Sequence, residues 1–535
     1  MNSVVVAAAA GALFFVGYRF YARVIARLFG ADASRKTPAY EKYDGVDYVP
    51  AKHWTVLFGH HFSSIAGAAP VIGPILALAY WGWVPAIIWI VLGTVLIGGV
   101  HDFGTLMASV RHGGSSIAGV AEELVSRRAR ILFSLFIWLT LVLILAVFTY
   151  LCAGTLVEKE EIVIPSLGLI PVAVLTGYLL YQRKTRQVPT TILGLGLLAA
   201  ALVLGNYLPV GLGRHGLEIW MLVLLVYCVV ASVTPVHILL QPRDYLSAFL
   251  LFIGVGVGYL GLVVSHPAIK LPAFLKWEGP NGPLWPILFV TVACGAISGF
   301  HSLIASGTTS KQLPSERYAQ RIGYGGMVAE GLVAALALLV VASGFREHAG
   351  LTEMLKPGRA GPIAAFGQGF SAVTKPLLAG FGGLVAITIL NAFILTTLDS
   401  ATRITRYVTQ EIFGIRNRIV ATLPPVVCAG WLAWGKRWQA IWPVFGASNQ
   451  LMAALALMVV TVWLLSQRKL IRYTLLPGIF MLATTIGSLF YGLVGYFKGN
   501  KPLLAVISLV LVGLSLLLLG ESVAVLRKVM RKEKG

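Results

Sequence analysis

Several histidines in apolar stretches are the residues of this sequence whose chemistry is most informative. His60 and His61 are adjacent in the run GHHFSSIAGAAPVIGP, His101 directly precedes Asp102, and His301 lies in the run CGAISGFHSLIASGTTSKQL. Imidazole gains and loses a proton near neutral pH, and a neighbouring carboxylate can fix its tautomer or accept the proton. The sequence therefore predicts a proton relay, whose members we take to be His61, His101, Asp102, His301 and Asp399.

Simpler explanations exist for each of these residues. A neutral histidine within a membrane often only hydrogen-bonds a neighbouring helix, and Asp399 stands one turn before Arg403, which equally favours an ion pair. The Gly and Pro residues around His60 and His61 favour a functional role for that pair. Imidazole and carboxylate groups also bind metals. Because neither His-x3-His spacing nor a Cys partner accompanies them, we predict no metal and no other cofactor.

Other polar residues in apolar stretches support weaker predictions. Glu330 has no visible partner in the sequence, and Glu521 lies close enough to the C-terminal end to reach lipid headgroups. Hydrogen bonding between helices is the default expectation for Asn391, Asn449 and Gln450.

The composition explains why such residues deserve notice. Of the 535 residues, 57% are hydrophobic and only 12% are charged, against about 25% charged in a typical soluble domain. This excludes a soluble protein and predicts lipid as the main partner. The net charge of +21 does not indicate a nucleic-acid partner, because the basic residues occur in short runs between apolar stretches. The four cysteines lie in apolar segments without CxxC spacing, which argues against a disulfide framework.

Membrane-spanning helices must position the polar residues. A span needs roughly 20 mostly apolar residues, and about fifteen such stretches occur, at 3–18, 56–80, 83–108, 131–156, 163–181, 188–208, 217–240, 245–265, 286–306, 322–344, 379–400, 419–434, 442–465, 474–497 and 502–525.

The loop charges predict the orientation of these spans. With the N-terminus outside, 30 of the 42 Lys and Arg residues fall in cytoplasmic loops and 12 in external ones, as the positive-inside rule requires. The first stretch then reads as a retained helix rather than a signal peptide, and the C-terminus is cytoplasmic. This topology brings His60, His61, His237 and His301 to the cytoplasmic half of the membrane. The stretch 345–376 is expected to cap the outer face.

Three spans are predicted to be interrupted, because they contain Gly and Pro together with polar side chains. The first contains Gly67 and Pro70, the second contains Pro235, and the third contains Gly299. Backbone that is not helical survives in a membrane only where it is buried in protein or lines a polar cavity. Such breaks are therefore the best indication of a binding site.

The breaks and the orientation together predict an inverted repeat. We expect an all-α membrane protein with a 5+5 LeuT-like core, in which the broken spans lead two groups of opposite orientation. The predicted divisions are an N-terminal helix and loop at 1–55, a first repeat at 56–208, a second at 209–400 and additional helices at 401–535. Amide groups at the half-helix N-termini would face a substrate carboxylate.

Six runs in this order resemble the signature segments of the carbon starvation protein A family, namely GHHFSSIAGAAPVIGP, VHDFGTL, LLQPRDYL, ACGAISGFHSLIASGTTSKQL, LTTLDSATRITRY and IWPVFGASNQLMAALAL. They span residues 59–457. The resemblance implies a transporter of peptides or pyruvate in a bacterial or archaeal plasma (inner) membrane, related to the amino acid-polyamine-organocation superfamily. Matching positions include Arg243, Asp244 and Asn449. Together with the breaks, the resemblance selects these candidate substrate- or ion-binding residues: His60, His61, Ser63, Ser64, Gly67, Pro70, Pro235, Gln241, Gly299, His301, Ser306 and Thr308.

The leading functional hypothesis is import of a small carboxylate-bearing solute by cation symport with alternating access. The histidines favour protons over sodium as the coupling ion. A sodium-coupled symporter of the same fold is the first alternative. An intramembrane histidine-metal enzyme and a channel are the others, and the sequence has neither an HExxH helix nor an evident nucleophile with a paired base. We therefore do not predict an enzyme. The sequence makes no prediction of oligomeric state.

Overall fold

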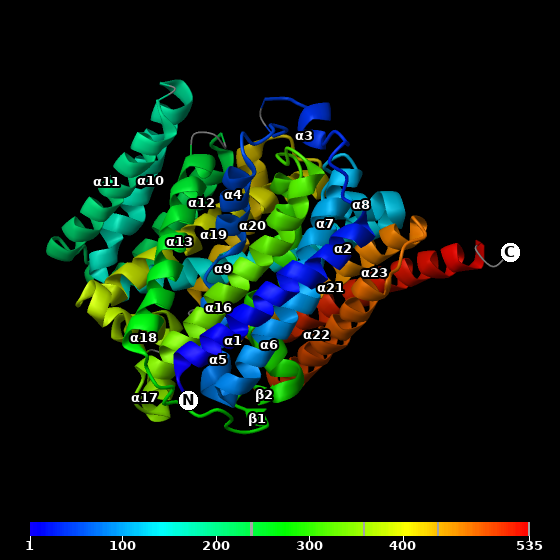
Figure 1. The fold of residues 1–535 in the computed structure, drawn as a ribbon. Helices are drawn as coiled ribbons and strands as arrows, with labels where there is room; N and C mark the ends of the chain where they lie inside the picture. The colour runs from blue at the N-terminus through cyan, green and yellow to red at the C-terminus, as the bar shows by residue number, and fades with distance from the viewer. Residues whose placement is uncertain (46, 184, 236–238, 357–358, 436–437, 533–535) are drawn as a thin grey trace.

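The computed structural model describes residues 1–535 apart from positions 46, 184, 236–238, 357–358, 436–437 and 533–535 (Figure 1). The described part is a bundle of helices. The one sheet among the described residues is the short antiparallel pair of β1 (Glu278–Gly279) and β2 (Gly282–Pro283), which lies in the connection between two spans. His237, one of the predicted inner-half histidines, lies outside the described residues.

The helices of the first half of the chain are α1 (Ser3–Val16), α2 (Ala22–Phe29), α3 (Pro38–Glu41), α4 (Trp54–Ile65), α5 (Ala69–Trp81), α6 (Trp83–Leu92), α7 (Gly99–Arg111), α8 (Ile117–Leu124), α9 (Arg127–Glu158), α10 (Val163–Gly177), α11 (Gln187–Tyr207), α12 (Gly216–Val233) and α13 (Leu240–Ser265). Those of the second half are α14 (Phe289–Thr291), α15 (Gly299–Ile304), α16 (Gly325–Gly344), α17 (His348–Met354), α18 (Gly361–Leu378), α19 (Gly382–Phe413), α20 (Arg418–Trp434), α21 (Trp438–Ser466), α22 (Arg472–Lys498) and α23 (Pro502–Lys532).

Membrane-spanning helices make up most of this bundle. Among the described residues, 12 helices are long and apolar enough to cross a membrane, and the bent pair α4 and α5 raises this number to 13. Two further predicted spans differ in form. One is the shorter apolar helix α20, and the other is the interrupted stretch 284–309.

The predicted break at Gly67 is confirmed. Helix α4 ends at Ile65, α5 begins at Ala69, and their axes are bent by 46°. Pro70 explains the bend, because proline has no N–H to donate and its ring clashes with the carbonyl four residues earlier, here that of Ala66. A side chain at Gly67 would put its Cβ 2.8 Å from Thr397 Oγ1, so the break packs closely on α19.

The predicted break near Gly299 is also confirmed. Helix α14 ends at Thr291, a 3-10 turn covers Ala293–Gly295, and α15 begins at Gly299. The two breaks are neighbours in space. A Cβ on Gly73 of α5 would lie 2.9 Å from the Cα of Val292, so backbone meets backbone there.

The predicted break at Pro235 is wrong. Helix α12 ends at Val233 and α13 begins at Leu240, so Pro235 lies in the connection between two spans, where its side chain is exposed. Pro242, in the first turn of α13, does not interrupt that helix because proline is tolerated there. Pro235 is therefore not part of an interrupted span.

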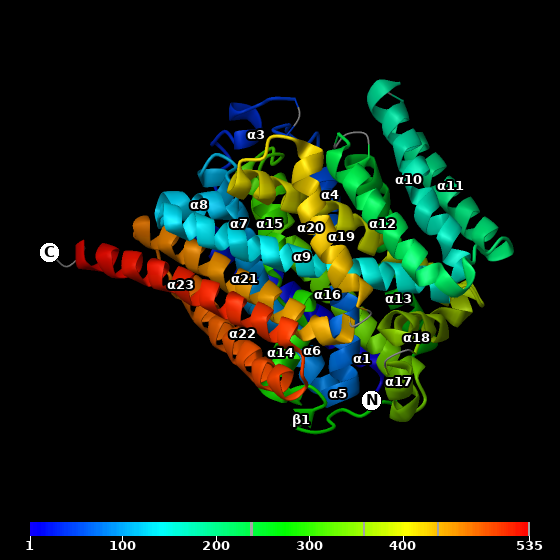
Figure 2. The same ribbon diagram turned by 180° about the vertical axis from the view of Figure 1, so that it is seen from behind.

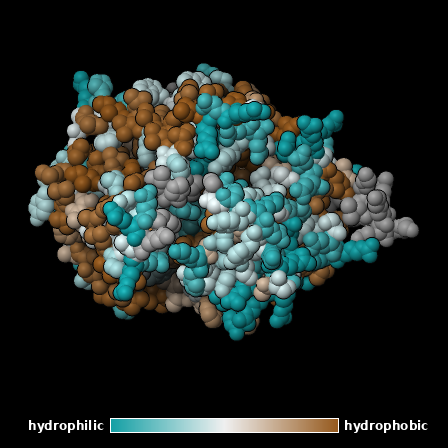
Figure 3. Space-filling model, turned by 90° about the horizontal axis from the view of Figure 1, so that it is seen from above, coloured by the Kyte–Doolittle hydropathy of each residue, from teal (hydrophilic) through white to brown (hydrophobic). Residues whose placement is uncertain are grey.

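Loops that the sequence assigns to one side of the membrane do meet at one face. Arg111 Nη2 donates to the Gly30 carbonyl and to Glu316 Oε2, each at 2.7 Å, and Lys469 Nζ donates to the Phe29 carbonyl. We call this the basic face. Figure 3 looks down on it and shows hydrophilic residues gathered over much of its surface, with hydrophobic residues around part of the margin.

The opposite face brings together the remaining connections. Ser3 Oγ donates to the Pro267 carbonyl, Leu275 N donates to the Trp81 carbonyl, and His348 Nε2 lies 2.8 Å from the carbonyl oxygen of Ala79. The predicted cap at 345–376 forms α17 and α18, and α18 packs against α5, α13, α16 and α19.

Two pairs of helices flank the central bundle (Figures 1 and 2). Helices α10 and α11 form a hairpin on one side, which contacts the bundle through α13 and α19. Helices α22 and α23 lie on the other side, against α21. The helices between these pairs contain both breaks.

Candidate functional site

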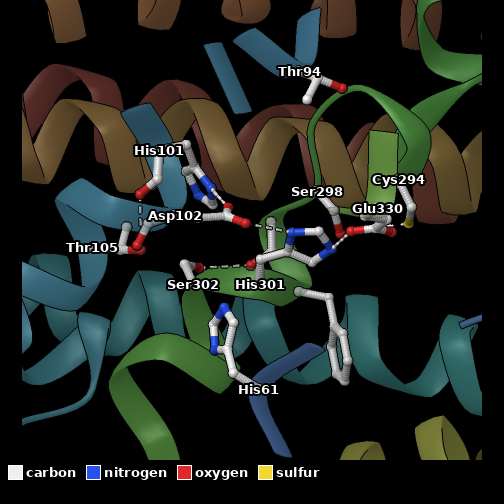
Figure 4. Close-up of polar contacts among 12 residues, drawn as sticks. His61, Thr94, His101, Asp102, Thr105, Cys294, Ser298, His301, Ser302 and Glu330 are labelled. Carbon is white, nitrogen blue, oxygen red and sulfur yellow. Dashed lines mark hydrogen bonds and ion pairs between the residues drawn. The ribbon is translucent and has the colours of Figure 1, made fainter. Parts of the chain in front are cut away.

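A buried imidazole between two carboxylates lies next to the second break (Figure 4). His301 Nδ1 is 2.8 Å from Asp102 Oδ2, and His301 Nε2 is 2.9 Å from Glu330 Oε2. The three residues come from α15, α7 and α16, and each side chain is 0% exposed. We call them the His301 group.

Asn449 holds the segment that carries His301. Its Oδ1 accepts a hydrogen bond from the backbone N–H of Phe300 at 2.9 Å, and its Nδ2 donates to Ser298 Oγ at 3.0 Å. Asn449 therefore caps the first turn of α15 from the neighbouring helix α21. These contacts agree with the interhelical hydrogen bonding expected of this residue, and they position His301 two residues into the helix.

The other two histidines of the predicted relay lie beside the His301 group. His101 Nδ1 is 2.7 Å from Asp102 Oδ1, and His61 Nδ1 is 2.9 Å from Thr309 Oγ1. The Nε2 atoms of both rings have no hydrogen-bonding partner in the described part of the chain. Figure 4 shows His61 reaching toward His301 from α4, with no interaction drawn between them.

The electrostatics of the His301 group favour an added proton. Two carboxylates and one protonated imidazole carry one net negative charge. An uncompensated charge buried away from water costs several kcal/mol, on the order of 3–5 when a partner is removed. A further proton on either carboxylate makes the cluster neutral.

A second polar cluster joins α4, α12, α13 and α19, and we call it the His60 group. His60 Nδ1 is 3.1 Å from Asp244 Oδ2, and Arg243 Nη2 is 3.4 Å from Asp244 Oδ1. Arg243 Nη1 also contacts Asp399 Oδ2 and donates to the Tyr227 hydroxyl, which donates to the same Asp399 oxygen at 2.8 Å.

The His60 group changes the interpretation of Asp399. Asp399 pairs with Arg243 rather than with Arg403, so the ion pair suggested by the sequence is wrong. Arg403 Nη2 instead donates to the carbonyls of Ala231 and Thr234, at 2.8 and 2.5 Å. Asp399 and His301 therefore belong to different clusters, and no described contact joins them into one relay.

A cavity of about 360 Å³ opens toward the basic face and adjoins the His60 group. Its wall includes segments of α4, α8, α9, α13, α15 and α19, and residues of the loops on that face. Five candidate residues line it: His60, Ser64, Gln241, Ser306 and Thr308. Of the described histidines that the sequence assigns to the cytoplasmic half of the membrane, His60 lines the cavity, whereas His61 and His301 do not.

The remaining candidate residues have structural partners. Ser63 Oγ donates to the His60 carbonyl, and Pro70 lies in the first turn of α5. Gly299 permits the close approach of α21, because a Cβ there would collide with the backbone of Asn449. Ser306 and Thr308 also donate to carbonyls one turn earlier in their own segment.

Some residues of these clusters are missed or undervalued by reasoning from sequence. The span boundaries place Arg243 in a connecting loop, and Tyr227 is not among the candidate residues, whereas both are in the His60 group. Glu330, which has no visible partner in the sequence, contacts His301. The indication available was a charged Arg243–Asp244 pair beside a long apolar stretch, since intramembrane charges are rarely without function.

The geometry does not provide a metal centre among the described residues, where no group of three His, Cys, Asp or Glu side chains is suitably placed. What the clusters offer is proton binding. The His301 group combines acid and base within hydrogen-bonding distance, and the His60 group does so at the wall of a cavity.

Comparison with known proteins agrees with transport. A family model described as "Carbon starvation protein CstA" matches residues 2–350 and 346–488. The peptide transporter CstA of Escherichia coli strain K12 is 34% identical, with 91% of this chain and 80% of that protein covered. The pyruvate/proton symporter BtsT of the same strain is 31% identical, with 89% and 80% covered.

The fold itself resembles that of a solved transporter. The structure of the Eremococcus coleocola manganese transporter in complex with an aromatic bis-isothiourea substituted compound matches with a TM-score of 0.53 at 15% identity, covering 91% of this chain and 98% of that chain. At this identity the likeness concerns the fold alone. Because the family model and its relatives span most of the sequence, the chain belongs to the carbon starvation protein CstA family.

Proposed function

We propose that this protein is a secondary active transporter that imports peptides or pyruvate together with protons by alternating access. The observation that carries the proposal is the His301 group, a carboxylate–imidazole–carboxylate cluster with 0% exposed side chains beside two adjacent helix breaks. Groups that gain and lose protons are expensive inside a membrane and typically mark proton pathways. The names of the relatives supply the substrate classes.

We propose a repeat that differs from the boundaries 56–208 and 209–400 predicted from sequence. The first group comprises 54–81, 83–111, 127–158, 216–233 and 240–265, with the hairpin of α10 and α11 inserted. The second comprises 284–309, 316–344, 382–413, 418–434 and 438–466. Each group then begins with a broken span, and each has a 32-residue third member, α9 or α19, which pack on each other.

The mechanism follows from the position of the cavity. The cavity reaches the basic face, where Asp47, Lys311 and Glu411 line it, so this conformation corresponds to the inward-facing state if that face is cytoplasmic, as the loop charges favour. The same orientation leaves the N-terminus outside, the C-terminus in the cytoplasm and the transporter in the bacterial plasma membrane. Reorientation around the two breaks would then open the opposite face.

The N-termini of the two half-helices offer few free amides to an anion. In α5, Pro70 has no N–H, and the amides of Val71 and Ile72 donate to the Ala68 carbonyl. In α15, the Phe300 amide donates to Asn449. This favours side chains of the cavity wall over these backbone amides as partners of a substrate carboxylate.

Uptake into proteoliposomes tests the proposal. Purified protein is reconstituted, and radiolabelled pyruvate or L-alanyl-L-alanine is supplied under an imposed pH gradient, an imposed sodium gradient or neither. We expect accumulation above the equilibrium level only when the outside is more acidic. Accumulation driven by sodium alone contradicts proton coupling, and uptake that never exceeds equilibrium indicates a channel.

A further inference from the structure

The His60 group has an imbalance of charge unless His60 is protonated. Arg243 contributes one positive charge, whereas Asp244 and Asp399 contribute two negative charges, and all three side chains are 0% exposed. A buried ion without a counter-charge is strongly destabilising. A proton on His60, whose Nδ1 is 3.1 Å from Asp244 Oδ2, makes the sum zero.

The geometry of His60 leaves one nitrogen free for a ligand. Its Nδ1–H donates to Asp244, which fixes the orientation of the ring. Its Nε2 has no hydrogen-bonding partner in the described part of the chain, and neither has the hydroxyl of Ser64 one turn later. Both residues line the cavity. When His60 is protonated, Nε2 is a charged donor that lacks an acceptor.

We propose that protonated His60 binds the carboxylate of the transported substrate in this cavity, and that Asp244 is the positioning residue that orients the His60 ring and supplies its counter-charge. The proposal rests on the proposed function and specifies where substrate and proton meet. Ser64 and the amide of Gln241, both in the cavity wall, complete the set of polar groups. A hydrogen bond between a cation and a carboxylate is about twice as strong as a neutral one.

Proton and substrate then favour each other at one site. By linkage, the substrate binds more tightly as the pH falls, and the proton binds more tightly when substrate is present. The His301 group is separate, because it does not line the cavity. The electric field at His60 also depends on the charged and titratable groups of α4 itself, of the elements packed around it and of the cavity wall. These groups are His61, Arg243, Asp244, Asp399, Arg403, His301, Lys311, Arg321, Glu330 and Asp47.

Equilibrium binding to the purified full-length protein tests the proposal. The probes are pyruvate, L-alanyl-L-alanine and L-alanyl-L-alaninamide, which lacks the carboxylate, each measured from pH 5 to 8. In the wild type we expect the carboxylate probes to bind more tightly at low pH. In His60→Gln, which preserves a donor to Asp244 but not the charge, their affinity falls roughly tenfold or more and becomes independent of pH. The amide probe binds both proteins about equally weakly.

Asp244→Asn tests the positioning role, and His215→Gln, at an exposed histidine of a connecting loop, is the matched control. Asp244→Asn removes the charged partner of His60, so binding of the carboxylate probes should weaken and depend less on pH. Wild-type affinity and pH dependence in His60→Gln overturn the proposal, as does an absence of pH-dependent binding of both carboxylate probes in the wild type. If wild-type proteoliposomes still accumulate substrate under a pH gradient, the transport function stands despite either result.

Discussion

Glu330 and Asp102 contact the same imidazole but differ in their other partners. Asp102 has a second partner, because His101 Nδ1 lies 2.7 Å from Asp102 Oδ1. The Glu330 carboxylate, in contrast, has His301 as its partner among the described polar contacts. A carboxylate with fewer hydrogen-bond donors is less well compensated as an anion in an apolar environment. We therefore expect Glu330, rather than Asp102, to be the carboxylate of the His301 group that passes a proton on during transport.

Replacement of this acid should separate coupling from substrate movement. We expect Glu330→Gln to lower pH-driven accumulation by at least tenfold while substrate exchange between equal internal and external concentrations continues, because the amide imitates a permanently protonated acid. Initial rates of both processes in proteoliposomes provide the measurement. Glu353→Gln, in an exposed ion pair with Lys356, is the control and should behave as wild type. Equal loss of both processes would assign Glu330 a structural role instead.

The ion pairs of the His60 group predict an order of stabilities. Arg243→Gln leaves Asp244 and Asp399 without their cation and should reduce the free energy of unfolding by about 3–5 kcal/mol. Asp399→Asn leaves Arg243 paired with Asp244 and should cost less. The double variant Arg243→Gln/Asp399→Asn should be more stable than Arg243→Gln alone. Thermal unfolding in detergent gives the order, and a double variant less stable than both single variants would exclude the pairing.

These residues show where inference from sequence ends. His101 and Asp102 are neighbours in the chain, so their interaction is predictable. For Asp102 and His301, the sequence predicts only that both lie at a similar depth in the cytoplasmic half of the membrane. The partnership of His301 with Glu330, and that of Asp399 with Arg243, depends on which faces of distant helices meet. An isolated sequence has no local pattern that specifies those contacts.

At the scale of elements, the contact between the two broken helices is the most demanding feature of the bundle. Gly73 of α5 faces the backbone of the second break, where an added Cβ would lie 2.5 Å from the Thr291 carbonyl oxygen. A side chain there cannot be accommodated by rotating a neighbour, because backbone occupies the space. Gly73 thus permits the two breaks to share one interior.

Gly73→Ala should therefore separate the broken helices. We expect a loss of stability of about 1–3 kcal/mol, typical of overpacking, together with a fall in transport. Gly256→Ala is the matched control, because Gly256 is an exposed residue of α13 where an added Cβ would meet no other atom within 4 Å. Alanine favours helix over glycine by up to about 1 kcal/mol, so the control should unfold no earlier than wild type. Unaltered melting of Gly73→Ala would show that the helices are not in contact as described.

Elements are predictable to the extent that their causes are local. The conflict between Pro70 and the preceding carbonyl is a property of a few consecutive residues, so the first break is correctly expected. Pro235 has the same local chemistry, yet it lies between two spans. The prediction failed there because a proline that follows the end of a helix and a proline that breaks a helix look alike in sequence. The hairpin of α10 and α11 is likewise as apolar as the other spans, which is why the predicted repeat boundaries include it.

At the scale of the whole molecule, the two faces differ in charge and in access. The basic face has the cavity mouth and the loops around Arg111, whereas α17, α18 and the β1–β2 connection cover the opposite face. In a transporter with alternating access, one such closed face and one open face define a single state of the cycle. Access to the cavity should therefore depend on side and on substrate.

Cysteine labelling can test whether access to the cavity depends on the side of the membrane and on bound substrate. We expect Thr308→Cys, in the cavity wall, to react with a membrane-impermeant maleimide from the same side as Ser34→Cys on the basic face. It should not react from the side of Lys276→Cys, which lies on the opposite face. All three are made in a Cys428→Ser background, because Cys428 is the exposed native cysteine among the described residues.

Pyruvate or L-alanyl-L-alanine at acidic pH should slow labelling of Thr308→Cys several-fold, because an occupied cavity excludes the reagent and binding promotes reorientation. Reaction of Thr308→Cys from the Lys276 side in the absence of substrate would mean that the resting protein opens through the face that this structure shows closed.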